Sequence, residues 1–121
     1  MGSKVSFKDN SQSNHKHNGD DMQLKDFIKG WIVGDFEPTL YKTNEIEVGV
    51  KEYKKGDKEK PHLHKIATEI TILIRGKIKM KEVMNEGDIV VLKHEYCGFE
   101  ALEDSTLLVI KYPSVKGDKY D

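Results

Sequence analysis

The chain has 121 residues and a mass of 13.9 kDa, which suffices for one domain with a buried core and is too little for two. Its 20 basic and 21 acidic residues give a formal net charge of −1, so composition favours neither nucleic acid nor an anionic membrane as a partner. The single cysteine excludes a disulfide framework within the chain, and the sequence has neither a long apolar run nor the apolar stretch of a secretory signal, so we expect a cytoplasmic protein.

The first 21 residues form a segment of distinct composition. Residues 1–21 are rich in Ser, Asn, Asp, Lys and Gly, with Val5 and Phe7 as the substantial apolar side chains. Such a segment cannot bury enough surface to offset the entropy lost on ordering. We therefore expect a disordered polar tail over residues 1–21 and a folded domain over residues 22–121.

From residue 22 onward, short apolar runs alternate with Gly, Pro, Asn and Asp at intervals typical of an all-β sandwich or barrel. Residues 23–30 predict a helical turn that ends at Gly30. Short strands are then predicted in succession, at residues 31–33, 39–42, 46–53, 61–64, 68–75, 77–83, 89–93, 99–101 and 106–112. No long amphipathic helix is predicted.

The predicted strand at residues 68–75 has apolar side chains on both faces. If Glu69 points into the domain, Thr71 and Leu73 do so too, because alternate residues of a strand share a face. The opposite face then carries three isoleucines, Ile70, Ile72 and Ile74. A second surface should cover them, either the other sheet of a sandwich or a second copy of the chain. This pattern alone leaves the two covers open.

The most specific pattern in the chain lies between Gly56 and Gly76 and reads G-x5-H-x-H-x4-E-x6-G. On a strand, His62 and His64 direct two ring nitrogens to the same side, and neutral imidazole is the commonest metal ligand in proteins. Glu69 adds the negative charge that two neutral donors lack. Because the spacing from 64 to 69 is odd, a bend or bulge near residues 66–68 is required for the glutamate to join the histidines.

This string matches, position by position, the first conserved motif of the cupin superfamily, and the chain is identified as resembling a small single-domain cupin. The resemblance implies an all-β jelly-roll barrel of about eight to nine short antiparallel strands. It also implies that His62, His64 and Glu69 bind a divalent metal, and that Gly56 and Gly76 lie in the turns that bound the strands. Because cupins are often dimers, the resemblance favours a homodimer as the cover of the three isoleucines.

The second cupin motif, G-x5-P-x-G-x2-H-x3-N, is only half present. Residues 87–92 reproduce its opening, but counting forward puts Gly98 in the position of the fourth metal ligand, where the motif has histidine. Counting backward from Phe99 puts Cys97 there instead. Three alternatives stay open, in order of preference: three protein ligands with open positions, Cys97 as the fourth ligand, or His94.

Two histidines and one carboxylate leave coordination positions for water or substrate, and they suit Fe, Mn, Ni and Zn alike. We expect a small-molecule ligand and metal-assisted chemistry of the isomerase, epimerase or lyase type on a carbohydrate or nucleotide-sugar derivative, a substrate class that rests on the cupin resemblance. Glu95 or Glu100 is the predicted general base, from loop position alone. A non-catalytic binding module of cupin fold and an Fe(II)-dependent dioxygenase are the alternatives.

Overall fold

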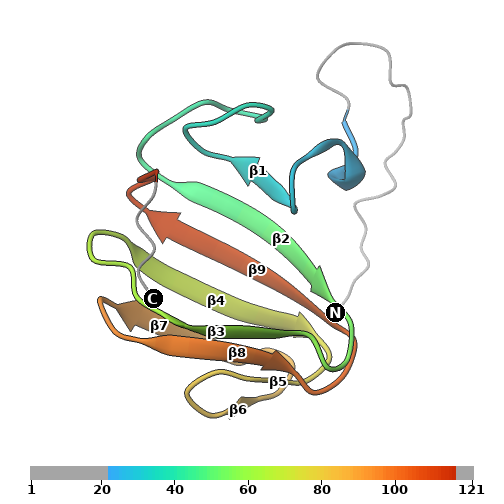
Figure 1. The fold of residues 1–121 in the computed structure, drawn as a ribbon. Helices are drawn as coiled ribbons and strands as arrows, with labels where there is room; N and C mark the ends of the chain where they lie inside the picture. The colour runs from blue at the N-terminus through green and yellow to red at the C-terminus, as the bar shows by residue number, and fades with distance from the viewer. Residues whose placement is uncertain (1–21, 117–121) are drawn as a thin grey trace.

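The computed structural model describes residues 22–116 and contains two antiparallel sheets that face one another (Figure 1). The predicted tail at residues 1–21 lies outside the described residues. The five-stranded sheet has the order β1-β2-β9-β4-β7, and its strands are β1 (Trp31–Val33), β2 (Glu47–Tyr53), β9 (Ser105–Tyr112), β4 (Thr68–Arg75) and β7 (Ile89–Lys93). The four-stranded sheet has the order β3-β8-β5-β6, and its strands are β3 (Lys58–His62), β8 (Cys97–Ala101), β5 (Ile78–Lys79) and β6 (Val83–Met84).

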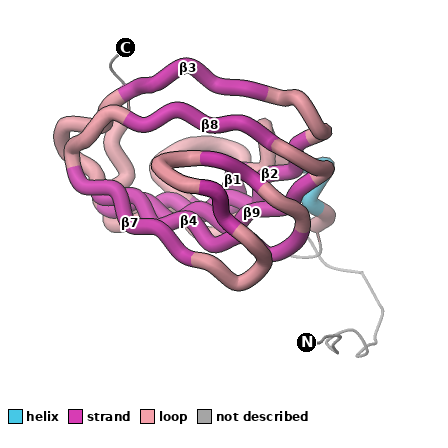
Figure 2. Tube along the Cα trace, turned by 90° about the horizontal axis from the view of Figure 1, so that it is seen from below, coloured by secondary structure: helices cyan, strands magenta, loops and turns pink. Residues whose placement is uncertain are grey.

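The layered arrangement confirms the predicted all-β jelly roll. Figure 2 shows β3 and β8 in one layer and β7, β4 and β9 in the other. Strands distant in the sequence are neighbours within a sheet, as with β2 and β9 or β3 and β8. The described strands form two sheets rather than one closed ladder of hydrogen bonds. No helix among residues 22–116 is long and apolar enough to cross a membrane.

Alternation along the strands gives the domain a core at one end of the sandwich. The inward residues of β4 change from polar to apolar along the strand, from Glu69 through Thr71 to Leu73, and Leu73 is fully buried. β9 runs the other way, from Leu107 to Lys111. The core cluster therefore gathers where the apolar ends of both strands meet, and consists of Leu73, Ile78, Met84, Phe99, Ala101, Leu107 and Val109.

The outer face of the five-stranded sheet is aliphatic across four strands. Two rows of cross-strand partners run over it, and they are Val48–Ile110–Ile70–Val91 and Val50–Leu108–Ile72–Ile89. Ile89 is 60% exposed and Val91 is 45% exposed. The predicted outward direction of Ile70, Ile72 and Ile74 is thus observed, and the opposite sheet of the sandwich is not what covers them.

Three strand predictions differ from the structure. Residues 39–42 form only an isolated bridge, between Gly34 and Lys42. The run at 77–83 folds back on itself as the hairpin β5–β6, in which Ile78 pairs with Met84. β3 begins at Lys58, earlier than predicted, and it includes Pro61; proline is tolerated there because β3 is an edge strand, where a missing N–H breaks no internal ladder.

Sequence and structure agree at the glycines that bound the histidine-containing segment. Gly56 precedes β3 with φ of +95°, and Gly76 follows β4 with φ of +102°, a region that other residues rarely adopt. A Cβ at Gly76 would also lie 2.4 Å from the carbonyl oxygen of Asp104. Both glycines therefore permit tight turns, as the motif predicts. The 3₁₀ turn η2 (Leu24–Asp26) lies within the predicted helical turn at residues 23–30.

Candidate metal and ligand site

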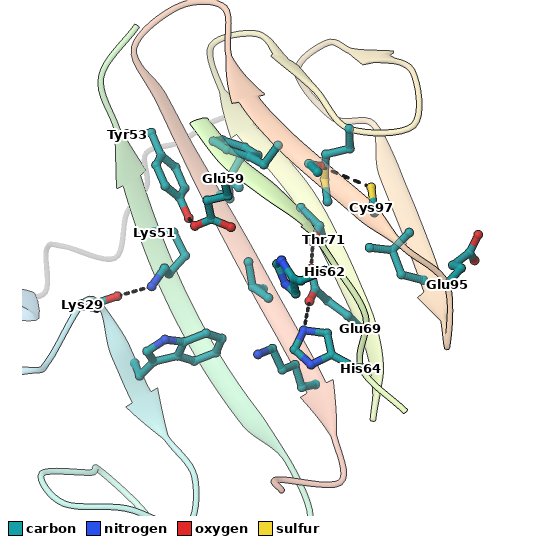
Figure 3. Close-up of a pocket in the computed structure, with 18 of the residues that line it drawn as sticks. Lys29, Lys51, Tyr53, Glu59, His62, His64, Glu69, Thr71, Glu95 and Cys97 are labelled. Atoms are coloured by element: carbon teal, nitrogen blue, oxygen red, sulfur yellow. Dashed lines mark hydrogen bonds and ion pairs between the residues drawn. The ribbon is translucent and has the colours of Figure 1, made fainter. Parts of the chain in front are cut away.

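A cavity of about 300 Å³ lies between the two sheets, at the polar end of the sandwich (Figure 3). Its walls include side chains from both sheets. The predicted motif residues His62, His64 and Glu69 all line it, and so does Thr71. The structure thus brings the three residues of the first motif into one cavity.

The chain crosses from one sheet to the other between the histidines and the glutamate. β3 ends at His62 in the four-stranded sheet, and β4 begins at Thr68 in the five-stranded sheet. Residues 65 and 66 form a bend between them. This bend resolves the odd spacing noted in the sequence, because Glu69 faces the histidines from the opposite sheet rather than from the same strand.

The donor atoms lie close together, with the side chains directed toward one another (Figure 3). The rings of His62 and His64 have centroids 5.0 Å apart and are nearly perpendicular. His64 Nε2 lies 3.5 Å from Glu69 Oε1, longer than an ordinary N–H···O hydrogen bond. Two ligands that each bind one ion at about 2.1 Å in a tetrahedral arrangement are roughly 3.4 Å apart. The spacing of this pair therefore suits a shared metal ion.

Thr71 orients the carboxylate of Glu69. Thr71 is 1% exposed, and its hydroxyl donates a hydrogen bond of 3.1 Å to Glu69 Oε2. The other oxygen, Oε1, is the one that faces His64. Hydrogen bonds of this kind fix the orientation of metal ligands and are part of a functional metal site.

The arrangement is not a finished coordination sphere. Within residues 22–116, no group of three or more His, Cys, Asp and Glu side chains is arranged so that it could hold a metal ion with the side chains in these positions. His62 Nδ1 instead lies 3.3 Å from the carbonyl oxygen of Lys60. The donor set fits a divalent cation in chemistry and in the spacing of the His64–Glu69 pair, and a ring nitrogen of His62, which lines the same cavity, is available as a third donor.

The two side chains predicted as alternatives for a fourth ligand, Cys97 and His94, occupy different places around the cavity. Cys97 and His94 both line it, whereas Gly98 offers no side chain. Cys97 is the cross-strand partner of His62, and its thiol donates to the carbonyl oxygen of Gly98 at 3.3 Å. Burial, together with the negative charge of Glu69, raises the pKa of the Cys97 thiol. His94 Nε2 lies 3.3 Å from the carbonyl oxygen of Ile66.

The two predicted general bases are not placed alike. Glu95 lies at the rim, directed away from the histidines (Figure 3), and accepts a hydrogen bond of 2.7 Å from Lys81 Nζ. That bond lowers the pKa of Glu95, which makes its carboxylate a weaker base. Glu100 alternates with the inward residues Phe99 and Ala101 on β8 and is not among the residues that line the cavity.

Sequence reasoning missed a hydrogen-bonded acid pair in the cavity. Tyr53 donates from its hydroxyl to Glu59 Oε2 at 3.1 Å, and both residues line the cavity. Burial, followed by the neighbouring Glu59, raises the pKa of Tyr53 far above its usual value, so the phenol keeps its proton. The two residues are only six positions apart, on strands of different sheets. The position of Glu59 three residues before His62 was the available signal.

Comparison with known proteins supports the fold. No protein-family model and no curated protein matches the chain. Among solved structures, KdgF from Halomonas sp. is 22% identical with a TM-score of 0.57, over 61% of this chain and 74% of that one. A protein with a double-stranded β-helix domain from Klebsiella pneumoniae is 20% identical with a TM-score of 0.58, and the match covers 62% of this chain and 69% of that one. A sugar phosphate isomerase of the cupin superfamily from Silicibacter pomeroyi is 18% identical with a TM-score of 0.53, and the match covers 56% of this chain and 50% of that one.

The two sheets and the inward-facing polar site define a small β protein of the double-stranded β-helix class. More particularly, the chain has the cupin fold, which confirms the resemblance drawn from the Gly56–Gly76 motif. At these identities the likeness establishes the fold, and the chemistry must be argued from the residues of the cavity.

Proposed function

We propose that this protein is a divalent-metal-dependent enzyme that moves a proton on a small polar molecule, with isomerisation or epimerisation as the reaction type. The observation that carries the proposal is the meeting of His62, His64 and Glu69 in one cavity. When bound there, a divalent metal supplies Lewis acidity that polarises a substrate carbonyl or hydroxyl. A sugar derivative is the proposed substrate class, in line with the sugar phosphate isomerase that shares this fold.

The Tyr53–Glu59 pair gives the cavity a group that can move a proton. Glu59 Oε1 is the carboxylate oxygen not engaged by Tyr53, and it is the atom proposed to accept a proton from substrate. The hydrogen bond from Tyr53 to Oε2 orients the Glu59 carboxylate. The Tyr53 ring in turn packs against Phe99, with ring centroids 4.3 Å apart. This pair favours an enzyme over the alternative of a non-catalytic binding module, which needs no such group.

Hydrogen exchange at substrate carbon tests the proposal. The protein, loaded in turn with Fe, Mn, Ni and Zn, is incubated in D2O with aldose and ketose phosphates, and exchange at the carbon next to the carbonyl is followed by NMR. We expect exchange with the wild type and at least a 100-fold slower rate with Glu59→Gln. Glu52→Gln on the outer face of β2 is the matched control. Metal retention without exchange on any substrate would favour the binding module, and activity confined to Fe with oxygen uptake would favour the dioxygenase.

We also propose that a second copy of the chain covers the outer face of the five-stranded sheet. The eight aliphatic residues of the two rows cover on the order of 250 Å² of sheet, from the usual strand and residue spacings. A stable interface buries about 800 Å² per partner, so these rows would form its apolar centre and neighbouring residues its rim.

The cytoplasmic location predicted from the sequence stays a prediction.

Charge placed in the aliphatic rows should separate the copies. We expect the wild type to sediment as a dimer at micromolar concentration and Val91→Lys to sediment as a monomer, because a lysine there would be desolvated at the interface. Val83→Lys is the matched control, since Val83 is 50% exposed on β6 of the other sheet. A wild type that remains monomeric at 100 micromolar, measured by analytical ultracentrifugation, would contradict the homodimer.

A further inference from the structure

One wall of the cavity carries two ammonium groups beside a single aromatic ring. Lys51 Nζ lies 4.8 Å from the ring centroid of Trp31, and Lys111 Nζ lies 4.9 Å from it. All three residues line the cavity that holds His62, His64 and Glu69. Cation–π contacts at these distances hold both ammonium groups near the ring.

The three residues of this wall lie on paired strands of the five-stranded sheet. Trp31 lies on the edge strand β1 and packs flat on β2 at Gly49, where a Cβ would approach a ring atom to 2.7 Å. Lys51 is an inward residue of β2 and donates to the carbonyl oxygen of Lys29. Lys111 is an inward residue of β9, directly between Glu47 and Glu69 in the cross-strand register. The lysines are therefore placed by strand pairing rather than by a mobile loop.

The two carboxylates beside Lys111 in the cross-strand register, Glu47 and Glu69, each accept a hydrogen bond from a hydroxyl group. Glu47 Oε2 accepts a hydrogen bond of 2.9 Å from Ser114, and Glu69 Oε2 accepts one from Thr71. At the rim, Glu95 is paired with Lys81. The cavity is lined by three lysines, Lys29, Lys51 and Lys111, and by three carboxylates, Glu59, Glu69 and Glu95, so a divalent cation at Glu69 would leave a surplus of positive charge. A surplus of positive charge in a partly dehydrated site favours an anionic ligand.

We propose that the cavity binds a small organic anion whose carboxylate or phosphate group is held by Lys51 and Lys111 beside Trp31, while its reacting end faces His62, His64 and Glu69. This deepens the proposed function, on which it rests for the role of the metal end, by naming the charge class of the substrate. A cavity of about 300 Å³ is at the lower end of small-molecule sites, so the ligand is the size of a sugar acid or a sugar phosphate.

Calorimetric titration with three matched sugars tests the proposal. Glucose, glucuronate and glucose 6-phosphate differ in charge at one carbon, and each is titrated into metal-loaded and metal-free protein. We expect both anions to bind at least tenfold more tightly than glucose, and Lys111→Met and Lys51→Met each to weaken anion binding about tenfold, the value of one charge-assisted hydrogen bond. The comparison of glucuronate with glucose 6-phosphate shows which anion the lysines accept.

Controls separate failure of this inference from failure of the metal proposal. Lys79→Met, at an exposed lysine of β5 that does not line the cavity, should bind the anions as the wild type does. Lys111→Met should retain metal at least as well as the wild type, because it removes a positive charge near Glu69. Equal affinity for glucose and for both anions, or lysine variants that bind the anions normally, would overturn the inference even if metal is retained. Lysine-dependent anion binding without metal retention would support it and overturn the metal proposal.

Discussion

Replacing Glu69 with glutamine should abolish stoichiometric retention of divalent metal. Glutamine keeps the size of the side chain and can still accept the hydrogen bond from Thr71, but it removes the negative charge opposite His64. Loss of a group that hydrogen-bonds to a metal ligand typically costs about 10–100-fold in metal affinity, so loss of the anionic ligand itself should cost roughly 100-fold or more. His64→Ala should act in the same direction. The measurement is elemental analysis after loading with Fe, Mn, Ni or Zn and desalting.

Two further variants make the result specific. Thr71→Val keeps the shape of the side chain and removes only the hydroxyl that orients Glu69, so we expect an intermediate loss of about 10–100-fold. Glu52→Gln removes an exposed carboxylate from the opposite face of β2 and should leave metal retention unchanged. Full retention by both Glu69→Gln and His64→Ala would show that this cavity is not the metal site.

Truncation of Leu73 to alanine should have the largest effect on stability. Leu73 has no exposed surface and belongs to the core between the sheets. Truncating a fully buried leucine to alanine lowers the free energy of unfolding by about 2–5 kcal/mol, because the transfer free energy of the removed atoms is lost and a cavity is left behind. Because a domain of this size has a total stability of about 5–15 kcal/mol, we expect Tm to fall on the order of 10–20 °C.

The neighbouring residue provides the control for this prediction. Ile74 lies next to Leu73 on β4 but points to the opposite face and is 53% exposed. Ile74→Ala should therefore change the free energy of unfolding by less than about 1 kcal/mol in the monomer. Denaturant unfolding of both variants in the Val91→Lys background, which we expect to be monomeric, gives the comparison, and equal losses would mean that Leu73 does not belong to the core as described.

The parts of the fold predicted from sequence were those encoded by local periodicity. β4, β7 and β9 have strong two-residue alternation or continuous β-branched runs, and each was predicted within a residue of its observed bounds. The lysine alternation at residues 77–81 predicts one strand in place of β5 and β6, because the alternation continues through the hairpin turn. A local pattern does not show where a strand folds back, since that depends on the pairing of Ile78 with Met84.

The site shows the same division between local and long-range information. His62, His64 and Glu69 lie within eight residues of sequence, and their spacing carried the prediction of a common cavity. The cationic wall joins Trp31, Lys51 and Lys111, which are brought together only by the pairing of β2 with β1 and β9. Nothing in the sequence near any one of them signals the other two. The position of Glu100 in the sequence, close to the second motif, predicts a general base, but the alternation of β8 places this residue outside the cavity lining.

The position of the histidines and of Glu69 on opposite sheets has a mechanical consequence. Apolar side chains join the two layers at one end, whereas the layers meet through polar groups at the other end, where His64 faces Glu69. An ion bound by residues of both layers would cross-link them at the polar end. Its free energy of binding would then stabilise the folded state relative to the unfolded one. The concentration of metal would thereby set how often β3 separates from β4 and exposes the interior to water.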